Sequence, residues 1–188
     1  MRYLNYLLFA AMLASLQGCF PMVAAGVGSG ALMAADRRTA GTYIEDEGIE
    51  DKATSQISAK YKDAAHVNVT SFNRHVLITG EAPNEETKTD IARIVAGVQN
   101  VKAVSNELVV SGVSTLSSRS GDSIITADVK LRFINNKVFE PDQVKVVTEN
   151  GSVFLMGLVY HKEADAAAEI ASTTRGVLRV VKVFEYLD

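Results

Sequence analysis

The sequence predicts an α+β fold made of two tandem copies of one small module, each with the element order α-β-β-α-β. The first observation is a repeat, because the block 67–80 matches the block 144–157 and flanking blocks match in the same order. The second is periodicity, since helical and strand-like spacings of apolar residues alternate in the same way in both copies. The third is Asn150-Gly151, a dipeptide that strongly indicates a tight hairpin turn.

The elements of each copy follow in order from these patterns. An amphipathic helix is expected over about residues 45–62 and again over 122–138, where Pro141 stops it. A hairpin comes next, then a second helix that follows Pro83 in copy one and begins near His161 in copy two, then a Val-rich strand. Because a helix joins the second and third strands, these strands are parallel, whereas the hairpin is antiparallel. Each module is therefore expected to be a three-stranded mixed sheet with two helices on one face.

Two details of the repeat lead to more specific expectations. Gly97 and Gly176 are aligned with each other and are expected just after the second helix, where glycine commonly takes a left-handed conformation. The run 153–156 (VFLM) is apolar on both faces of its strand, although a small open sheet usually alternates. Something therefore covers the sheet face that the helices leave free, and the other copy, a partner or a second chain could do so.

The N-terminus indicates export and lipid attachment. The apolar run 6–16 has 11 residues, which suits a signal peptide better than a membrane-spanning helix of about 20. Leu16-Gln17-Gly18-Cys19 resembles the bacterial lipobox, in which the chain is cut before the cysteine and the cysteine is lipidated. The alternative is an ordinary secretory peptide with an incidental cysteine. Bacterial sorting usually uses an Asp after that cysteine for inner-membrane retention, and here the residue is Phe20, so delivery to the outer membrane is expected.

These features divide the chain into five segments. Residues 1–18 are expected to be the signal peptide, and residues 19–43 the lipidated Cys19 with a flexible Gly- and Ala-rich tether. The first module is expected over 44–111, a linker over 112–121 and the second module over 122–188.

Composition and motifs argue against several classes of function. The net charge of −3 is unlike that of a general nucleic-acid binder, and the single cysteine excludes an intramolecular disulfide or a multi-thiolate metal site. His66, His75 and His161 lack metal-ligand spacing, and His75 is expected in a loop. Carboxylates over 45–51 are interpreted as helix-start residues that complement the dipole. We therefore expect that the chain is not an enzyme, and that it has no catalytic residue, metal site, cofactor or small-molecule substrate.

The informative feature is a difference between the first helices of the two copies. In copy two the core stripe is Ile125, Val129 and Phe133, and a second apolar stripe lies well over a quarter-turn away. The equivalent positions of copy one are polar or lack a side chain: Gly48, Asp51, Ser55, Ser58 and Lys62. An apolar stripe beside lysines suits an anionic membrane surface, although it could instead pack on copy one. The candidate lipid-binding residues are Ile124, Ala127, Lys130, Leu131, Ile134, Lys137 and Val138.

The modules resemble the BON domain, a family named for bacterial envelope and nodulation proteins. Its hallmarks are a glycine after the second strand, here Gly80 and Gly157, and a Gly-Val-x-x-Val before the third, here 97–101 and 176–180. The resemblance covers about residues 40–188. With the lipobox and tether, the chain resembles the dual-BON outer-membrane lipoproteins, in particular those associated with division and outer-membrane stress.

This resemblance implies a lipid-anchored outer-membrane protein that faces the periplasm and binds anionic phospholipid through its second BON copy. It also implies support of envelope integrity and enrichment at the division site. The alternative function is a periplasmic protein-binding adaptor that docks an outer-membrane assembly machine through its sheets. Binding to vesicles separates the two, because a lipid binder follows the anionic lipid content and an adaptor ignores it.

Overall fold

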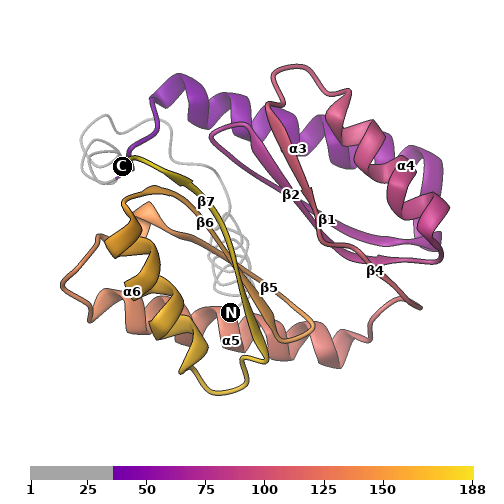
Figure 1. The fold of residues 1–188 in the computed structure, drawn as a ribbon. Helices are drawn as coiled ribbons and strands as arrows, with labels where there is room; N and C mark the ends of the chain where they lie inside the picture. The colour runs from indigo at the N-terminus through magenta and orange to yellow at the C-terminus, as the bar shows by residue number, and fades with distance from the viewer. Residues whose placement is uncertain (1–35) are drawn as a thin grey trace, which may run out of the picture. The chain divides into compact units, whose positions relative to one another are not determined.

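The computed structural model describes residues 36–188, which form two modules of the same architecture (Figure 1). The expected signal peptide, Cys19 and the tether up to residue 35 lie outside the described residues. Among the described helices, none is both long and apolar enough to cross a membrane.

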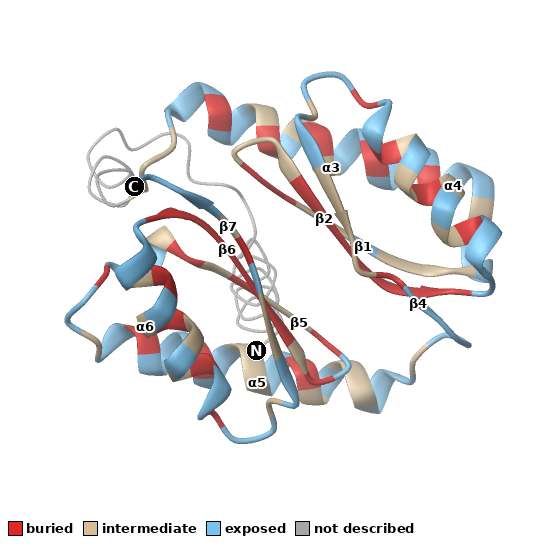
Figure 2. Cartoon of the chain, in the orientation of Figure 1, coloured by how far each residue is buried: buried red, intermediate tan, exposed pale blue. Residues whose placement is uncertain are grey.

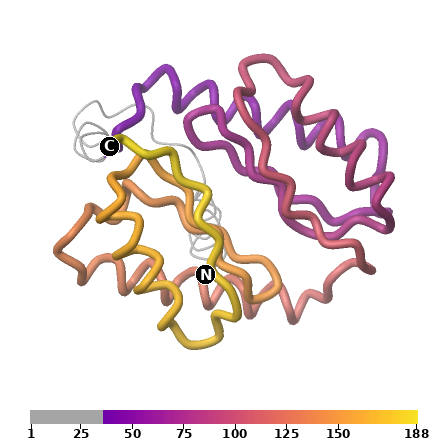
Figure 3. The backbone as a smooth tube through the Cα atoms, viewed as in Figure 1, coloured from indigo at the N-terminus to yellow at the C-terminus, as the bar shows by residue number. Residues whose placement is uncertain are grey.

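Both modules have the predicted order of a long helix, a hairpin, a shorter helix and a closing strand (Figure 3). The first module consists of α3 (Ala40–Tyr61), the 3-10 turn η1 (Lys62–Ala64), β1 (His66–Phe72), β2 (His75–Ala82), α4 (Glu85–Ala96), β3 (Ala103–Asn106) and β4 (Val109–Val110). The second consists of α5 (Leu116–Ile134), the 3-10 turn η2 (Pro141–Gln143), β5 (Lys145–Glu149), β6 (Ser152–Val159), α6 (His161–Ser172) and β7 (Arg179–Tyr186). The predicted α+β class and element order are confirmed.

The strand pairing also agrees with the prediction. The hairpins β1–β2 and β5–β6 are antiparallel, and β3 and β7 pair in parallel with β2 and β6 respectively. The short β4 also pairs in parallel with β2, so the closing strand of the first module is interrupted at Glu107 and Leu108. Leu108 is only 1% exposed and belongs to the module's core, and its amide donates to the side-chain oxygen of Asn106.

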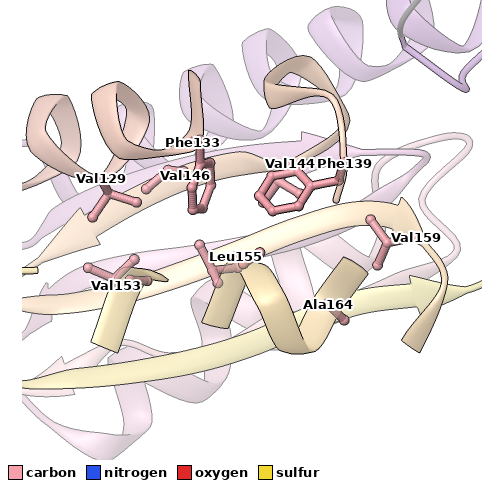
Figure 4. Packing of buried hydrophobic residues seen from close by; sticks show 11 residues of the cluster. Val129, Phe133, Phe139, Val144, Val146, Val153, Leu155, Val159 and Ala164 are labelled. Atoms are coloured by element: carbon pink, nitrogen blue, oxygen red, sulfur yellow. The ribbon is translucent and has the colours of Figure 1, made fainter. Parts of the chain in front are cut away.

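Each module has its own core between the helices and one face of the sheet. In the second module, Val129 and Phe133 of α5 point toward Val146, Val153 and Leu155 of the strands (Figure 4). Ile125 is partly buried and packs against the same cluster, so the predicted core stripe is confirmed. Each large apolar side chain buried in this way contributes about 1.5–3 kcal/mol to stability. Figure 2 shows the same pattern of buried residues on the inner side of α3 and α4.

A third cluster lies on the sheet faces that the helices leave free. Phe72 and Leu77 of the first module pack there with four side chains of the second, Phe154, Met156, Leu158 and Val183. Polar contacts join the same two modules, including Lys145 Nζ to Glu50 Oε1 at 3.0 Å. The second face of the apolar strand β6 is therefore covered by the other copy, which is one of the three alternatives that the sequence left open.

The bounds of the second long helix differ from the prediction at both ends. Helix α5 begins at Leu116 rather than at residue 122, so six of the ten residues of the expected linker are helical. Thr115 caps it by accepting from the Ser118 amide, and the hydroxyls of Ser120 and Ser123 donate to carbonyls one turn earlier. Serines whose hydroxyls donate to the preceding turn in this way are compatible with a helix. The Ser-rich composition of this segment is nevertheless typical of a linker.

Helix α5 ends at Ile134 rather than at residue 138. The side-chain oxygen of Asn136 accepts from the amides of Val138 and Phe139, and its Nδ2 donates to the carbonyl of Phe133. This local turn competes with helical hydrogen bonding and ends the helix before Pro141 is reached. Lys137 and Val138 consequently lie in the following loop.

The alignment of Gly97 with Gly176 is wrong by about one helical turn. Gly97 is the C-cap residue of α4 with a φ of −80°, and the corresponding C-cap of α6 is Thr173. The structural counterpart of Gly176 (φ 89°) is Asn100 (φ 74°). Asparagine tolerates the left-handed conformation better than other non-glycine residues, so copy one uses Asn100 where copy two uses glycine.

A buried aspartate on each long helix holds the hairpin of its own module. Asp46 accepts from the amides of Asn73 and Arg74, and Asp122 accepts from those of Asn150 and Gly151. All four turn residues have positive φ, as the predicted type of turn requires. The interpretation of Asp46 as a helix-start residue is therefore wrong, because α3 begins at Ala40 and Asp46 faces the hairpin.

Candidate membrane-binding site

The stripe predicted on the second long helix lies on the solvent side of α5 and of the loop that follows it. Its large apolar members are strongly exposed: Ile124 is 64%, Leu131 58%, Ile134 65% and Val138 42% exposed. Ala127, Lys130 and Lys137 are exposed as well. The seven residues are therefore surface residues, and the two modules meet through their sheets rather than through this stripe.

The basic residues near the stripe differ in their contacts. Arg132 donates to the carbonyl of Ile170 and to the hydroxyls of Thr173 and Thr174, so it fastens α5 to the end of α6. Within residues 36–188, neither Lys130 nor Lys137 forms an ion pair. These two ammonium groups remain available to an anionic surface.

Helix α3 provides the matched surface without the apolar stripe. Thr39 and Thr115 cap the two long helices in the same way, which fixes the structural alignment of α3 with α5. In this alignment Ser55 and Ser58 of α3 correspond to Leu131 and Ile134 of α5, and both serines are exposed. The two helices thus share their buried face and differ in their outer face.

A cavity of about 420 Å³ lies beside one end of the stripe, between the modules. Lys130 and Ile134 line it from α5, and Tyr43 and Glu47 line it from α3. Its wall also carries Arg38, whose guanidinium donates hydrogen bonds to Asp36 and Asp46. The Cζ atom of Arg38 lies 4.0 Å from the centroid of the Phe72 ring. Because the acidic side chains outnumber the basic ones along this wall, we do not assign the cavity to an anionic headgroup.

The three histidines have different surroundings. His75 begins strand β2 and contacts the Ser105 hydroxyl with Nε2 at 2.9 Å, so the expected loop position is wrong, and burial lowers the pKa of its imidazole. His161 is exposed and stacks on Tyr186 while contacting Asp188. His66 lies near two buried carboxylates, Glu81 and Glu149.

The cluster of His66, Glu81 and Glu149 was not foreseen in the sequence. Its members come from β1, β2 and β5, so no local spacing connects them. Burial raises the pKa of Glu149 above its usual value. Burial acts in the same direction on Glu81, but hydrogen bonds from Asn150 and Ser114 outweigh it and lower the pKa of that carboxyl.

Comparison with known proteins matches this architecture. The BON domain model matches twice, over residues 45–112 and 121–188. The outer membrane lipoprotein DolP of Haemophilus influenzae is 43% identical over 92% of this chain and 91% of its own length. A 21 kDa hemolysin of Actinobacillus pleuropneumoniae is 37% identical over 81% and 80%, and the osmotically-inducible protein Y of Escherichia coli is 24% identical over 74% and 72%.

Two matches to the domain model cover most of the chain, and a relative of high identity covers nearly all of it. The resemblance predicted from the glycine and valine motifs is thereby confirmed, as is the expected location at the outer membrane. The chain belongs to the BON-domain family and is a dual-BON outer-membrane lipoprotein of the DolP type.

Proposed function

We propose that the second module binds anionic phospholipid membranes through the outer face of α5 and the loop after it. The observation that carries this proposal is the exposed stripe of Ile124, Leu131, Ile134 and Val138, which no described part of the chain covers. An apolar surface of this kind, with basic residues beside it, is typical of an interaction site. It is consistent with a lipoprotein whose lipid anchor keeps the module close to a membrane.

The chemistry of the stripe fits a lipid surface. Each apolar side chain withdrawn fully from water contributes about 1.5–3 kcal/mol, and each lysine near an anionic surface about 1 kcal/mol. Lys130 and Lys137 can supply this electrostatic attraction, because neither forms an ion pair with any described residue. Arg132 adds long-range attraction, but its donors are already used by α6.

The adaptor function receives less support from the fold. An adaptor was expected to dock its partner through the sheets. In the described part of the chain, the helix-free face of each sheet packs against the sheet of the other module. We therefore favour lipid binding over the adaptor function. We propose that the protein supports envelope integrity through this binding, and that it is enriched at the division site.

Sedimentation with vesicles tests the proposal. The chain from residue 20 onward, without the lipidation site, is mixed with vesicles of neutral lipid alone or of neutral lipid with added phosphatidylglycerol. We expect co-sedimentation that rises with the phosphatidylglycerol content and falls with salt. Binding that is absent, or equal on both kinds of vesicle, would argue for the adaptor instead.

Lipidation is a separate part of the proposal. We infer that Cys19 carries the acyl chains, because it is the single cysteine and ends the sequence Leu16-Gln17-Gly18-Cys19. Cys19→Ser should give a protein that incorporates no labelled fatty acid and leaves the outer-membrane fraction. Labelling that persists in Cys19→Ser would contradict the assignment.

A further inference from the structure

Three side chains that can hold a metal ion meet where the two modules touch. His66 and Glu81 belong to the first module and Glu149 to the second, and one donor atom of each lies within 4.8 Å of the other two. His66 Nδ1 is 3.1 Å from Glu81 Oε2 and 4.0 Å from Glu149 Oε1. Ligand atoms about 2.0–2.1 Å from a tetrahedral zinc ion lie roughly 3.3 Å apart, so small side-chain shifts would complete the geometry.

The negative charge of the two buried carboxylates, Glu81 and Glu149, is not balanced by nearby positive side chains. Glu81 is 1% and Glu149 6% exposed, and neither carboxylate forms an ion pair with a lysine or arginine among residues 36–188. Asp122 adds to the negative potential at Glu149. Buried charges are normally paired or coordinate a metal, and one imidazole cannot balance two carboxylates.

The carboxylates are also held in position by neighbouring groups. Asn150 Nδ2 donates to Glu81 Oε1 at 2.6 Å, and Asn68 Nδ2 donates to Glu149 Oε2 at 2.8 Å. Each amide thus crosses from one module to the other and occupies one oxygen, while the second oxygen of each carboxylate faces His66. Outer groups that orient ligands in this manner are a general property of metal sites.

A further polar group lies beside the cluster. The backbone amide of Ser114 donates to Glu81 Oε2 at 3.1 Å. The Ser114 hydroxyl oxygen is buried close to the same carboxylate. Such an oxygen can anchor a water molecule in the fourth position of a cation that has three protein ligands.

We propose that His66, Glu81 and Glu149 form a divalent-cation site, suited to zinc, that links the two BON modules. An imidazole nitrogen with two carboxylate oxygens matches the ligands that zinc accepts. The ligands come from both modules, so the cation binds only when the modules are docked. Binding therefore stabilises the docked arrangement and, with it, the orientation of α5 relative to the first module. The linear sequence did not predict this site, because its ligands are brought together only by the packing of the two sheets.

The test uses the full-length chain with Cys19→Ser in detergent, so that the only thiol cannot bind zinc, after treatment with a chelator. Zinc binding is measured by competition with a chromophoric chelator, and the thermal unfolding midpoint is measured with and without zinc. We expect one zinc ion per chain and a midpoint that rises with zinc concentration. His66→Gln and Glu149→Gln should each weaken binding at least tenfold, and Asn68→Ala about 10–100-fold.

His161→Ala is the matched control, because His161 is an exposed histidine that also contacts a carboxylate, Asp188. This variant should bind zinc as the parent chain does. The unfolding midpoint without zinc shows whether His66→Gln and Glu149→Gln remain folded. Zinc binding that is unchanged in folded His66→Gln, or a folded parent chain that takes up no zinc, would overturn the proposal. A thermal unfolding midpoint that changes with pH but not with zinc would also overturn the proposal. The three side chains would then bind protons but no cation.

Discussion

Helices α3 and α5 occupy the same place in their modules but present different outer faces to solvent. Both begin after a capping threonine, and both carry a buried aspartate that holds the hairpin of the module. On the outer face, Ser55 and Ser58 of α3 stand where α5 has Leu131 and Ile134. A repeated module can therefore keep its framework while one copy acquires a new surface, and the residues that differ indicate where function lies.

The buried aspartates test the shared framework and should have the largest effect on stability. Asp122→Ala leaves the turn amides of Asn150 and Gly151 without their acceptor, and a buried unsatisfied amide costs about 1–3 kcal/mol. Asp46→Ala should destabilise more, because Asp46 also accepts from Ser71 and Arg38. Chemical denaturation gives both free energies of unfolding. Equal losses, or losses below about 1 kcal/mol, would contradict the framework described above.

Transfer of the stripe tests whether the outer face is sufficient. Asp51→Ala, Ser55→Leu and Ser58→Ile place on α3 the residues found at the matched positions of α5. We expect this triple variant to recover part of the vesicle binding of a chain whose own stripe is disabled, by about 1–3 kcal/mol from the added apolar side chains. Sedimentation measures the gain, and no gain would mean that binding needs more than the stripe.

The lysines should have a smaller effect that depends on salt. Lys130→Ala and Lys137→Ala each remove about 1 kcal/mol of attraction to an anionic surface, which is roughly a fivefold change in affinity. The loss should shrink at high ionic strength, because exposed charges are screened. Lys52→Ala, on α3, is the control and should leave vesicle affinity unchanged at every salt concentration. An effect of Lys130→Ala that is independent of salt would mean that packing, not charge, is responsible.

Much of the fold could be predicted because the signals are local and occur twice. The helical stripe of Ile125, Val129 and Phe133, the turn at Asn150-Gly151 and the exposed stripe of α5 each depend on neighbouring residues. The ends of α5 were harder to predict, because side-chain hydrogen bonds of Thr115 and Asn136 determine where the helix begins and ends. The composition of the flanking segments indicated other positions.

Long-range contacts account for the rest. The apolar run 153–156 predicted that something covers the second face of β6, but which surface does so depends on the docking of two sheets. The same docking creates the cluster of His66, Glu81 and Glu149, whose members lie on three strands of two modules. No spacing along the chain identifies such a site.

A pair of charge substitutions at matched positions tests the central claim most directly. Leu131→Glu removes an exposed apolar side chain from α5 and places a negative charge against anionic headgroups, whereas Ser55→Glu makes the same addition on α3. Both positions are exposed and off the core stripe, so both variants should keep the thermal unfolding midpoint of the parent chain. We predict that Leu131→Glu loses most binding to phosphatidylglycerol vesicles and that Ser55→Glu binds as the parent does. A folded Leu131→Glu protein that still sediments fully with these vesicles would contradict the account.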